Sequence, residues 1–210
     1  MQVAAIIPVK KFSNAKTRLG LPQEKTELLC KIMLDEVLST ISQSQKINKI
    51  VLVSNDESAL KIGKRYNTVP IFEENEKGVN AAVSLAEKYL LVNGFDTSIV
   101  FPQDIPLMQP VDIDNLLAFQ KNTKSLLIVP SRKFDGTNAL LRTPVDVIET
   151  HYDEDSYKIH LSTAKSRGIP TSLVLIHRIM LDVDDWSDVE YIMGSIEKPQ
   201  IGDKLRKVLE

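Results

Sequence analysis

Short apolar runs alternate along the chain with longer segments in which apolar residues recur at helical spacing. The apolar runs are rich in β-branched residues, which is typical of strands buried on both faces. Strands that alternate with helices predict a mostly parallel sheet covered by helices on both faces. The predicted strands cover residues 3–8, 49–54, 69–72, 98–101, 125–130, 138–142 and 171–176.

The first helical segment, residues 24–41, has an apolar face that is expected to pack on the sheet. That face is assigned to Leu28, Leu29, Ile32, Leu38 and Ile41. Further helices are predicted over residues 57–66, 79–92, 112–121 and 156–167. A closing helix begins near Trp186, whose ring is expected to pack against the sheet. The late charged segment 197–210 is interpreted as a surface helix or an oligomer contact, so a homodimer is left open.

The order of the elements defines the fold class. The first three strands and the helices between them form a β-α-β-α-β opening half, which suggests a Rossmann-like arrangement. The runs 125–130 and 138–142 are separated by only a short segment, which suggests a small antiparallel excursion. No repeat or linker interrupts the pattern, so we expect one domain, residues 1–210, built as an α/β three-layer αβα sandwich.

Composition narrows the class of protein. With 43% hydrophobic and 26% charged residues, the chain is expected to be globular. Its formal net charge of -2 argues against the broad positive field of a nonspecific nucleic-acid-binding protein. No apolar run approaches the length of a membrane span, so a cytoplasmic protein is expected. Cys30 is the single cysteine, which excludes an internal disulfide, and is expected in the core.

In an open α/β sheet the ligand crevice lies beyond the carboxyl ends of the strands. The loop after the first strand reads P-V-K-K-F-S-N-A-K-T-R-L and carries Lys10, Lys11, Lys16 and Arg18. Cations near a helix start suit a triphosphate. The chain has neither a P-loop motif nor the dinucleotide fingerprint G-x-G-x-x-G. The alternative interpretation is a solvated basic loop.

Two acidic places follow other strands. Asp104 lies between Pro102 and Pro106, and a carboxylate there can coordinate Mg²⁺ or can serve as a turn or cap residue. The later acidic run supplies Asp182 and Asp184 as further candidate ligands. Its remaining acids, at positions 185 and 188, are interpreted as a cap and first-turn residue of the closing helix.

The fourth place is P-S-R-K-F-D-G-T-N, between the two late strands. Thr137 and Asn138 could donate hydrogen bonds to a phosphate or carboxylate of an acceptor, and Arg132 and Lys133 could add positive charge. A plain hairpin turn at Asp135-Gly136 explains the segment equally well.

Together these loops resemble the archaeal 2-phospho-L-lactate guanylyltransferase family, a branch of the MobA-like nucleotidyltransferases with a GT-A-type, Rossmann-like fold. The resemblance runs through most of the chain. It is carried by I-P-V-K with A-K-T-R-L, V-S-N-D, K-G-V-N-A-A-V, P-Q-D-I-P-L, G-T-N-A-L-L and L-D-V-D.

The resemblance implies an enzyme of coenzyme F(420) biosynthesis. Such an enzyme transfers GMP from GTP to 2-phospho-L-lactate and forms lactyl-2-diphospho-5'-guanosine and pyrophosphate with Mg²⁺ or Mn²⁺. The partners it implies are GTP and a small phosphorylated acid, with no nucleic acid and no membrane. The alternatives are the same chemistry on phosphoenolpyruvate, a sugar acid or a molybdopterin, or a noncatalytic nucleotide-binding domain.

The resemblance also implies residue roles. Lys16, Arg18 and Asp104 would be catalytic, and Asp104, Asp184 and, in reserve, Asp182 would bind metal. The acceptor would meet Thr137, Asn138 and Ser156. Nucleotide contacts are implied for Pro8, Val9, Lys10, Lys16, Arg18, Asp56, Gly78 and Asn80. Around Ser156 the chain reads H-Y-D-E-D-S-Y-K-I-H where the family has F-G-x-x-S, and D-D-W-S-D replaces the usual D-T-P-E-D.

Overall fold

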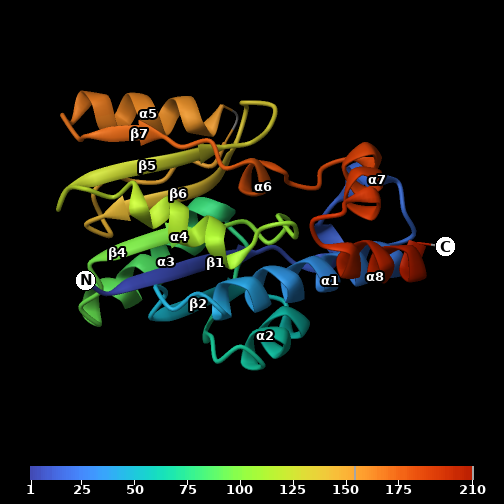
Figure 1. The fold of residues 1–210 in the computed structure, drawn as a ribbon. Helices are drawn as coiled ribbons and strands as arrows, with labels where there is room; N and C mark the ends of the chain where they lie inside the picture. Colours follow the sequence, from blue (N-terminus) through green and yellow to red (C-terminus); the bar gives the residue numbers. More distant parts are fainter. Residues whose placement is uncertain (154, 210) are drawn as a thin grey trace.

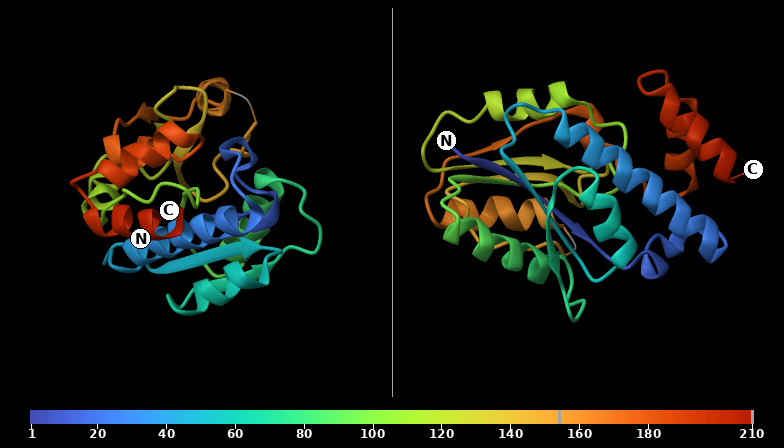
Figure 2. Two further views of the ribbon diagram at one scale, coloured as in Figure 1. Left: turned by 90° about the vertical axis from the view of Figure 1, so that its right-hand side faces the viewer. Right: turned by 90° about the horizontal axis from the view of Figure 1, so that it is seen from below.

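Seven strands form one sheet between two layers of helices in the computed structural model, which describes residues 1–153 and 155–209 (Figures 1 and 2). The strand order is β3-β2-β1-β4-β6-β5-β7. The strands are β1 (Val3–Val9), β2 (Lys49–Ser54), β3 (Val69–Phe72), β4 (Thr97–Val100), β5 (Ser125–Pro130), β6 (Thr137–Thr143) and β7 (Thr171–Leu173).

Strand directions confirm the predicted fold class. β6 pairs antiparallel with both β4 and β5, and the other paired strands run parallel. From β1 the chain builds outward to β2 and β3, and then returns to place β4 on the other side of β1. The order therefore reverses between β1 and β4. Ligands of open α/β sheets bind at such a switch point, beyond the carboxyl ends of the strands.

The helices bury a separate core on each face of the sheet. α3 (Val79–Val92) and α5 (Ser156–Ser166) cover one face, and the remaining helices contribute to the core on the other face. Those remaining helices are α1 (Gln23–Ser42), α2 (Glu57–Lys64), α4 (Pro110–Ala118), α6 (His177–Met180), α7 (Trp186–Gly194) and α8 (Pro199–Leu209). Two short 3-10 turns, η1 (Phe12–Asn14) and η2 (Thr17–Leu19), shape the loop after β1. Neither these turns nor α6 was predicted.

Helix α1 buries a face that differs from the predicted one. Leu29, Leu38 and Ile41 are fully buried, whereas Leu28 is 45% exposed and its placement on the packed face was wrong. Successive helical residues are about 100° apart, so Leu28 lies one step around the helix from the buried positions. Cys30 is buried on the packed face, as expected.

Trp186 does not pack against the sheet. Its side chain is 39% exposed, and its indole N–H donates to Glu190 at 2.9 Å along the surface of α7. Val189 and Ile192, one and two helical turns along, make the buried contacts instead. The predicted role of Trp186 was therefore wrong, because α7 turns its first residue toward solvent.

The late charged segment forms α8, which packs on α1 and α7 through Ile201 and Leu205. Gly202 approaches α7 so closely that a Cβ atom there would lie 2.8 Å from the Met193 carbonyl oxygen. Glu210, the end of the predicted segment, lies outside the described residues. Across 1–153 and 155–209, no helix has both the length and the apolar character required to cross a bilayer.

Candidate active site

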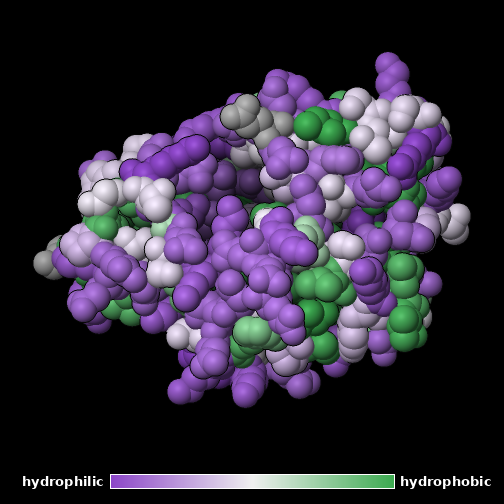
Figure 3. Space-filling model, turned by 180° about the vertical axis from the view of Figure 1, so that it is seen from behind, coloured by the Kyte–Doolittle hydropathy of each residue, from purple (hydrophilic) through white to green (hydrophobic). Residues whose placement is uncertain are grey.

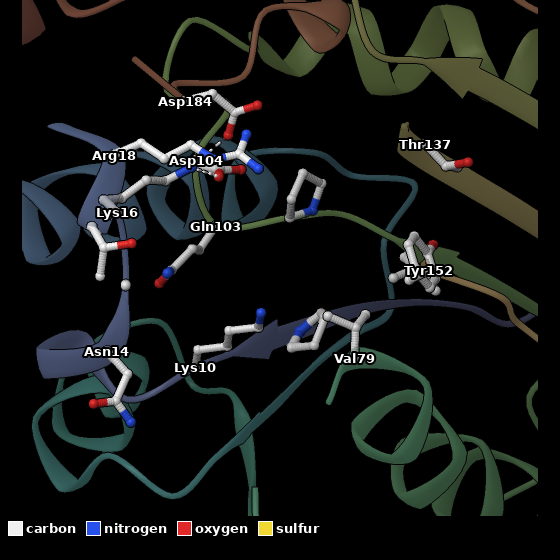
Figure 4. Close-up of a pocket in the computed structure, with 15 residues that line it drawn as sticks. Lys10, Asn14, Lys16, Arg18, Val79, Gln103, Asp104, Thr137, Tyr152 and Asp184 are labelled. Carbon is white, nitrogen blue, oxygen red and sulfur yellow. Dashed lines mark hydrogen bonds and ion pairs between the residues drawn. The ribbon is translucent and has the colours of Figure 1, made fainter. Parts of the chain in front are cut away.

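A pocket of about 470 Å³ opens at the switch point between β1 and β4 (Figure 4). The loop after β1, the loop after β4, the start of α3, β6 and the segment before α7 all contribute to its wall. Seen from behind, the molecule has a hollow bordered by hydrophilic residues (Figure 3). The lining residues are Pro8, Lys10, Asn14, Ala15, Lys16, Thr17, Arg18, Val79, Val100, Pro102, Gln103, Asp104, Thr137, Tyr152 and Asp184.

Lys16, in the basic loop after β1, contacts both of the predicted metal-ligand carboxylates, Asp104 and Asp184. Its ammonium group pairs with Asp104 and donates to Asp184 Oδ1 at 3.2 Å. The Lys16 side chain is only 10% exposed. Burial lowers the pKa of Lys16, but the two carboxylates outweigh burial and hold the pKa above its ordinary value. Lys16 therefore stays charged between two anions, and its left-handed backbone (φ 53°) directs the turn into η2.

A local network fixes Asp184 in place. Asp188 Oδ2 accepts hydrogen bonds from the backbone N–H groups of Asp184 at 2.9 Å and Asp185 at 3.0 Å. Asp188 Oδ1 receives a third bond from Arg132 at 2.8 Å. Asp185 caps α7 and forms a capping box with Asp188, which confirms the structural interpretation of these two acids. The side chain of Asp184 lines the pocket, where it accepts from Lys16.

Asp182 lies behind the pocket wall. Its carboxylate accepts from the amide of Asn138 at 3.1 Å, and that amide also donates to the Ile179 carbonyl at 3.0 Å. Burial, followed by the charge of Asp104, raises the pKa of Asp182 to about 6. Asn138 therefore holds Asp182, and neither residue is in the pocket lining.

The two pocket carboxylates suit a divalent metal. Asp104 Oδ1 is buried and has no hydrogen-bond donor among the described residues. Within that part of the chain, no three acidic, histidine or cysteine side chains form a preassembled metal cage. Mg²⁺ commonly binds through one or two carboxylates and completes its shell with substrate phosphates and water. Asp104 and Asp184 fit that pattern, provided that a triphosphate supplies further oxygens.

Most of the predicted nucleotide residues line the pocket or a small hollow beside it. Pro8, Lys10 and Arg18 line the pocket, and both cationic side chains are exposed to it. Val9 and Gly78 line a small hollow that shares Pro8, Lys10 and Val79 with the pocket. Gly78 precedes α3 with φ of 92°, a conformation that favours glycine, and a Cβ there would meet open space.

Asp56 and Asn80 are engaged in the framework around the pocket instead. Asp56 caps α2 through Ser58 N–H and Ala59 N–H, and it also accepts from Phe12 N–H at 3.0 Å. Asn80 accepts from Tyr152 N–H at 2.8 Å. Neither residue is in the pocket lining. Asp56 ties down the basic loop, and Asn80 positions the segment that carries Tyr152.

Thr137 and Tyr152 lie on the opposite side of the pocket from Lys16, Asp104 and Asp184 in the view of Figure 4. Ser156 is buried at the start of α5, and its hydroxyl donates to Thr137 at 3.0 Å. The predicted acceptor residues Thr137 and Ser156 are thus in contact with each other, and Thr137 reaches the pocket wall. Glu154, in the unusual segment before Ser156, lies outside the described residues.

Sequence reasoning missed several pocket residues, among them Gln103, Asn14 and Tyr152. Gln103 is 8% exposed, and its buried Oε1 has no donor among the described residues. Its position next to Asp104 was the available signal. Asn14 and Tyr152 carried no signal, because the first depends on the 3-10 turns after β1 and the second on the loop that Asn80 holds.

The fold of the chain is similar to that of solved nucleotidyltransferase structures. A crystal structure from Desulfovibrio desulfuricans, described as a nucleotide-diphospho-sugar transferase, aligns with a TM-score of 0.73 over 99% of both chains at 14% identity. The particular family follows from the sequence comparison. The chain belongs to the guanylyl transferase CofC-like family, whose model matches residues 3–208.

Named relatives in this family differ in their acceptor. A phosphoenolpyruvate guanylyltransferase of Conexibacter woesei is 30% identical over 90% of this chain and 86% of its own length. A 2-phospho-L-lactate guanylyltransferase of Methanothermobacter thermautotrophicus is 29% identical over 99% and 92%. A 3-phospho-D-glycerate guanylyltransferase of Colwellia psychrerythraea is 29% identical over 91% of each.

Proposed function

We propose that the pocket transfers GMP from GTP to 2-phospho-L-lactate and forms lactyl-2-diphospho-5'-guanosine and pyrophosphate, a step of coenzyme F(420) biosynthesis. The observation that carries this proposal is the position of Lys16 between Asp104 and Asp184 at the switch point. A cation and two carboxylates beside a basic loop support the proposal, because a metal-bound triphosphate requires charges of both signs. The relatives named for guanylyl transfer support the choice of GTP.

The basic loop would hold the triphosphate. Lys10 and Arg18 are exposed at the pocket and supply a point charge and a forked guanidinium for phosphate oxygens. Lys16 can turn from the carboxylates toward a phosphate. Asp104 and Asp184 would hold Mg²⁺ or Mn²⁺, which when bound neutralises charge on the reacting phosphates. These residues therefore bind and orient the donor.

The acceptor would enter from the side of Thr137 and Tyr152. One oxygen of its phosphate attacks the α-phosphorus of GTP, the bond from that phosphorus to the β-phosphate bridging oxygen breaks, and pyrophosphate leaves with the electron pair. The acceptor phosphate is already an anion at neutral pH, so no general base is needed. Catalysis rests on alignment and on charge neutralisation.

Phosphoenolpyruvate is the second candidate acceptor, because a relative that matches 90% of this chain is named for it. It has the same phosphate and carboxylate on adjacent carbon positions as 2-phospholactate. 3-Phosphoglycerate carries its phosphate one carbon further from the carboxylate and adds a hydroxyl. The three acceptors therefore differ mainly in shape, which the wall formed by Thr137 and Tyr152 would read.

The test is pyrophosphate release with each of the three acceptors and each of the four nucleoside triphosphates, with Mg²⁺ or with EDTA. We expect the highest kcat/KM for GTP with 2-phospho-L-lactate, no turnover in EDTA, and a product whose mass equals acceptor plus GMP less water. A higher kcat/KM with phosphoenolpyruvate would select the second candidate. No transfer to any acceptor would overturn the proposal.

A further inference from the structure

Thr137 is the centre of a buried chain of hydrogen bonds at the pocket wall. Its Oγ1 lies 3.0 Å from Ser156 Oγ and 3.1 Å from His160 Nδ1. Ser156 is 3% exposed and His160 is fully buried, while Thr137 also lines the pocket. Ser156 and His160 are thus buried partners of Thr137, and Thr137 is the member of the three that lines the pocket.

The backbone determines which nitrogen of His160 carries the proton. His160 Nε2 lies 2.9 Å from the backbone nitrogen of His151, which can only donate. Nε2 must therefore accept, and a neutral imidazole then carries its hydrogen on Nδ1. Burial lowers the pKa of His160 to about 3, which keeps the ring neutral. His160 Nδ1–H consequently donates to Thr137.

A count of hydrogens follows from this tautomer. The imidazole Nδ1–H and the two hydroxyl groups provide three hydrogens for two contacts, so one hydroxyl hydrogen is left over. With Ser156 and His160 both donating to Thr137, the lone pairs of its oxygen are used and its own hydrogen must be donated elsewhere. The pocket is the open side of this chain of hydrogen bonds.

We infer that His160 is a positioning residue that makes the Thr137 hydroxyl a fixed, uncharged hydrogen-bond donor for an anionic oxygen of the acceptor. This inference rests on the proposed function, because it assigns the wall at Thr137 to the acceptor. The matching ligand group is a phosphate or carboxylate oxygen, which offers lone pairs and no hydrogen. An alcohol binds there only by using its own lone pair, and an ammonium group cannot bind.

Two substitutions separate positioning from a structural role. In His160→Asn the amide nitrogen can replace Nδ1 and keep the bond to Thr137, but the acceptor for His151 N–H is lost. In His160→Gln the amide oxygen can replace Nε2 and keep the bond from His151, but the donor to Thr137 is lost. His177→Gln, at an exposed histidine of α6, is the matched control.

We expect His160→Gln to raise the acceptor KM about tenfold, the effect of one lost hydrogen bond to an anion, with the GTP KM unchanged. His160→Asn should keep the acceptor KM within about threefold of the wild type but melt at a lower temperature. The measurement uses whichever acceptor the wild type turns over best. Equal acceptor KM values for His160→Gln and wild type, or KM changes that follow melting temperature, would overturn the inference.

The tautomer is tested without turnover. In ¹⁵N-labelled protein, imidazole nitrogen shifts at pH 7 should show His160 protonated at Nδ1 and bare at Nε2. The opposite tautomer or a charged ring would overturn the inference even if guanylyl transfer is observed. If the wild type transfers GMP to no acceptor, the proposed function fails, and the nitrogen shifts still decide the state of His160.

Discussion

The backbone N–H of Val183 donates a hydrogen bond of 3.0 Å to the backbone carbonyl oxygen of Asp104. This bond joins the loop after β4 to the segment before α7, two parts of the chain that are far apart in sequence. It sets Asp184 beside Asp104, so that Lys16 can contact both carboxylates. This main-chain hydrogen bond therefore positions the two carboxylates on the acidic side of the pocket.

Lys16→Met should leave this carboxylate pair without its cation. Loss of one partner of a buried ion pair costs about 3 kcal/mol of unfolding free energy. Mg²⁺ without nucleotide should then raise the melting temperature of the variant more than that of the wild type, because the metal replaces the missing charge. Thermal melts with and without MgCl₂ measure this, with Lys204→Met on α8 as the control. An equal Mg²⁺ effect in variant and wild type would show that the pair does not bind metal in the absence of nucleotide.

Asp56→Ala should lower the free energy of unfolding. The substitution removes the cap of α2 and the acceptor for Phe12 N–H, so we expect a loss of about 2 kcal/mol in urea unfolding. Ser58→Ala is the control, because it alters the same turn and leaves the Asp56 carboxylate in place. A variant that unfolds like the wild type and binds GTP more weakly would instead support the predicted nucleotide contact of Asp56.

Acid should destabilise the fold through His160. Burial, and then the charges of His151 and Arg142, lowers its pKa from 6.5 to about 3. The unfolded chain therefore takes up the proton first, so the stability is complete above pH 6.5 and declines as the pH falls toward 3. Protonation of His160 in the unfolded chain lowers the free energy of unfolding by about 2 kcal/mol between pH 7 and pH 5. Urea unfolding at pH 7 and pH 5 should show this extra loss of stability in the wild type and not in His160→Asn. Identical losses in the two proteins would contradict the lowered pKa of His160.

Most of the fold could be predicted from the sequence, because the period of the apolar pattern is a local property. Residues 49–54, 69–72, 79–92 and 125–130 have the predicted bounds, since their apolar patterns match their elements. The short gap between 125–130 and 138–142 also correctly indicated the antiparallel strand. Leu28 and Trp186 were misplaced because the packed side of a helix depends on neighbours that are distant in sequence.

The candidate site could be predicted only in part. Lys10, Lys16, Arg18 and Asp104 follow β1 and β4, whose carboxyl ends meet, so the sheet brings them into one pocket. Asp184 was predicted at a strand end, but it follows α6 and reaches the same pocket from the segment before α7. The family resemblance implied a nucleotide contact for Asp56, but its carboxylate is used by backbone N–H groups that no spacing reveals. The role of His160 was hidden for a related reason, since its partners come from β6 and from the loop before α5.

Asp104→Asn tests the central claim most directly, because it removes one of the two charges proposed to bind metal while its amide oxygen can still accept from Lys16. The measurement is pyrophosphate release from GTP and the preferred acceptor in Mg²⁺, with Asp203→Asn, an exposed acid on α8, as the control. We predict that kcat/KM falls on the order of 100-fold or more in Asp104→Asn. Asp203→Asn should match the wild type. Near-normal turnover by a folded Asp104→Asn would contradict the assignment of this pocket as a metal-dependent nucleotidyltransferase site.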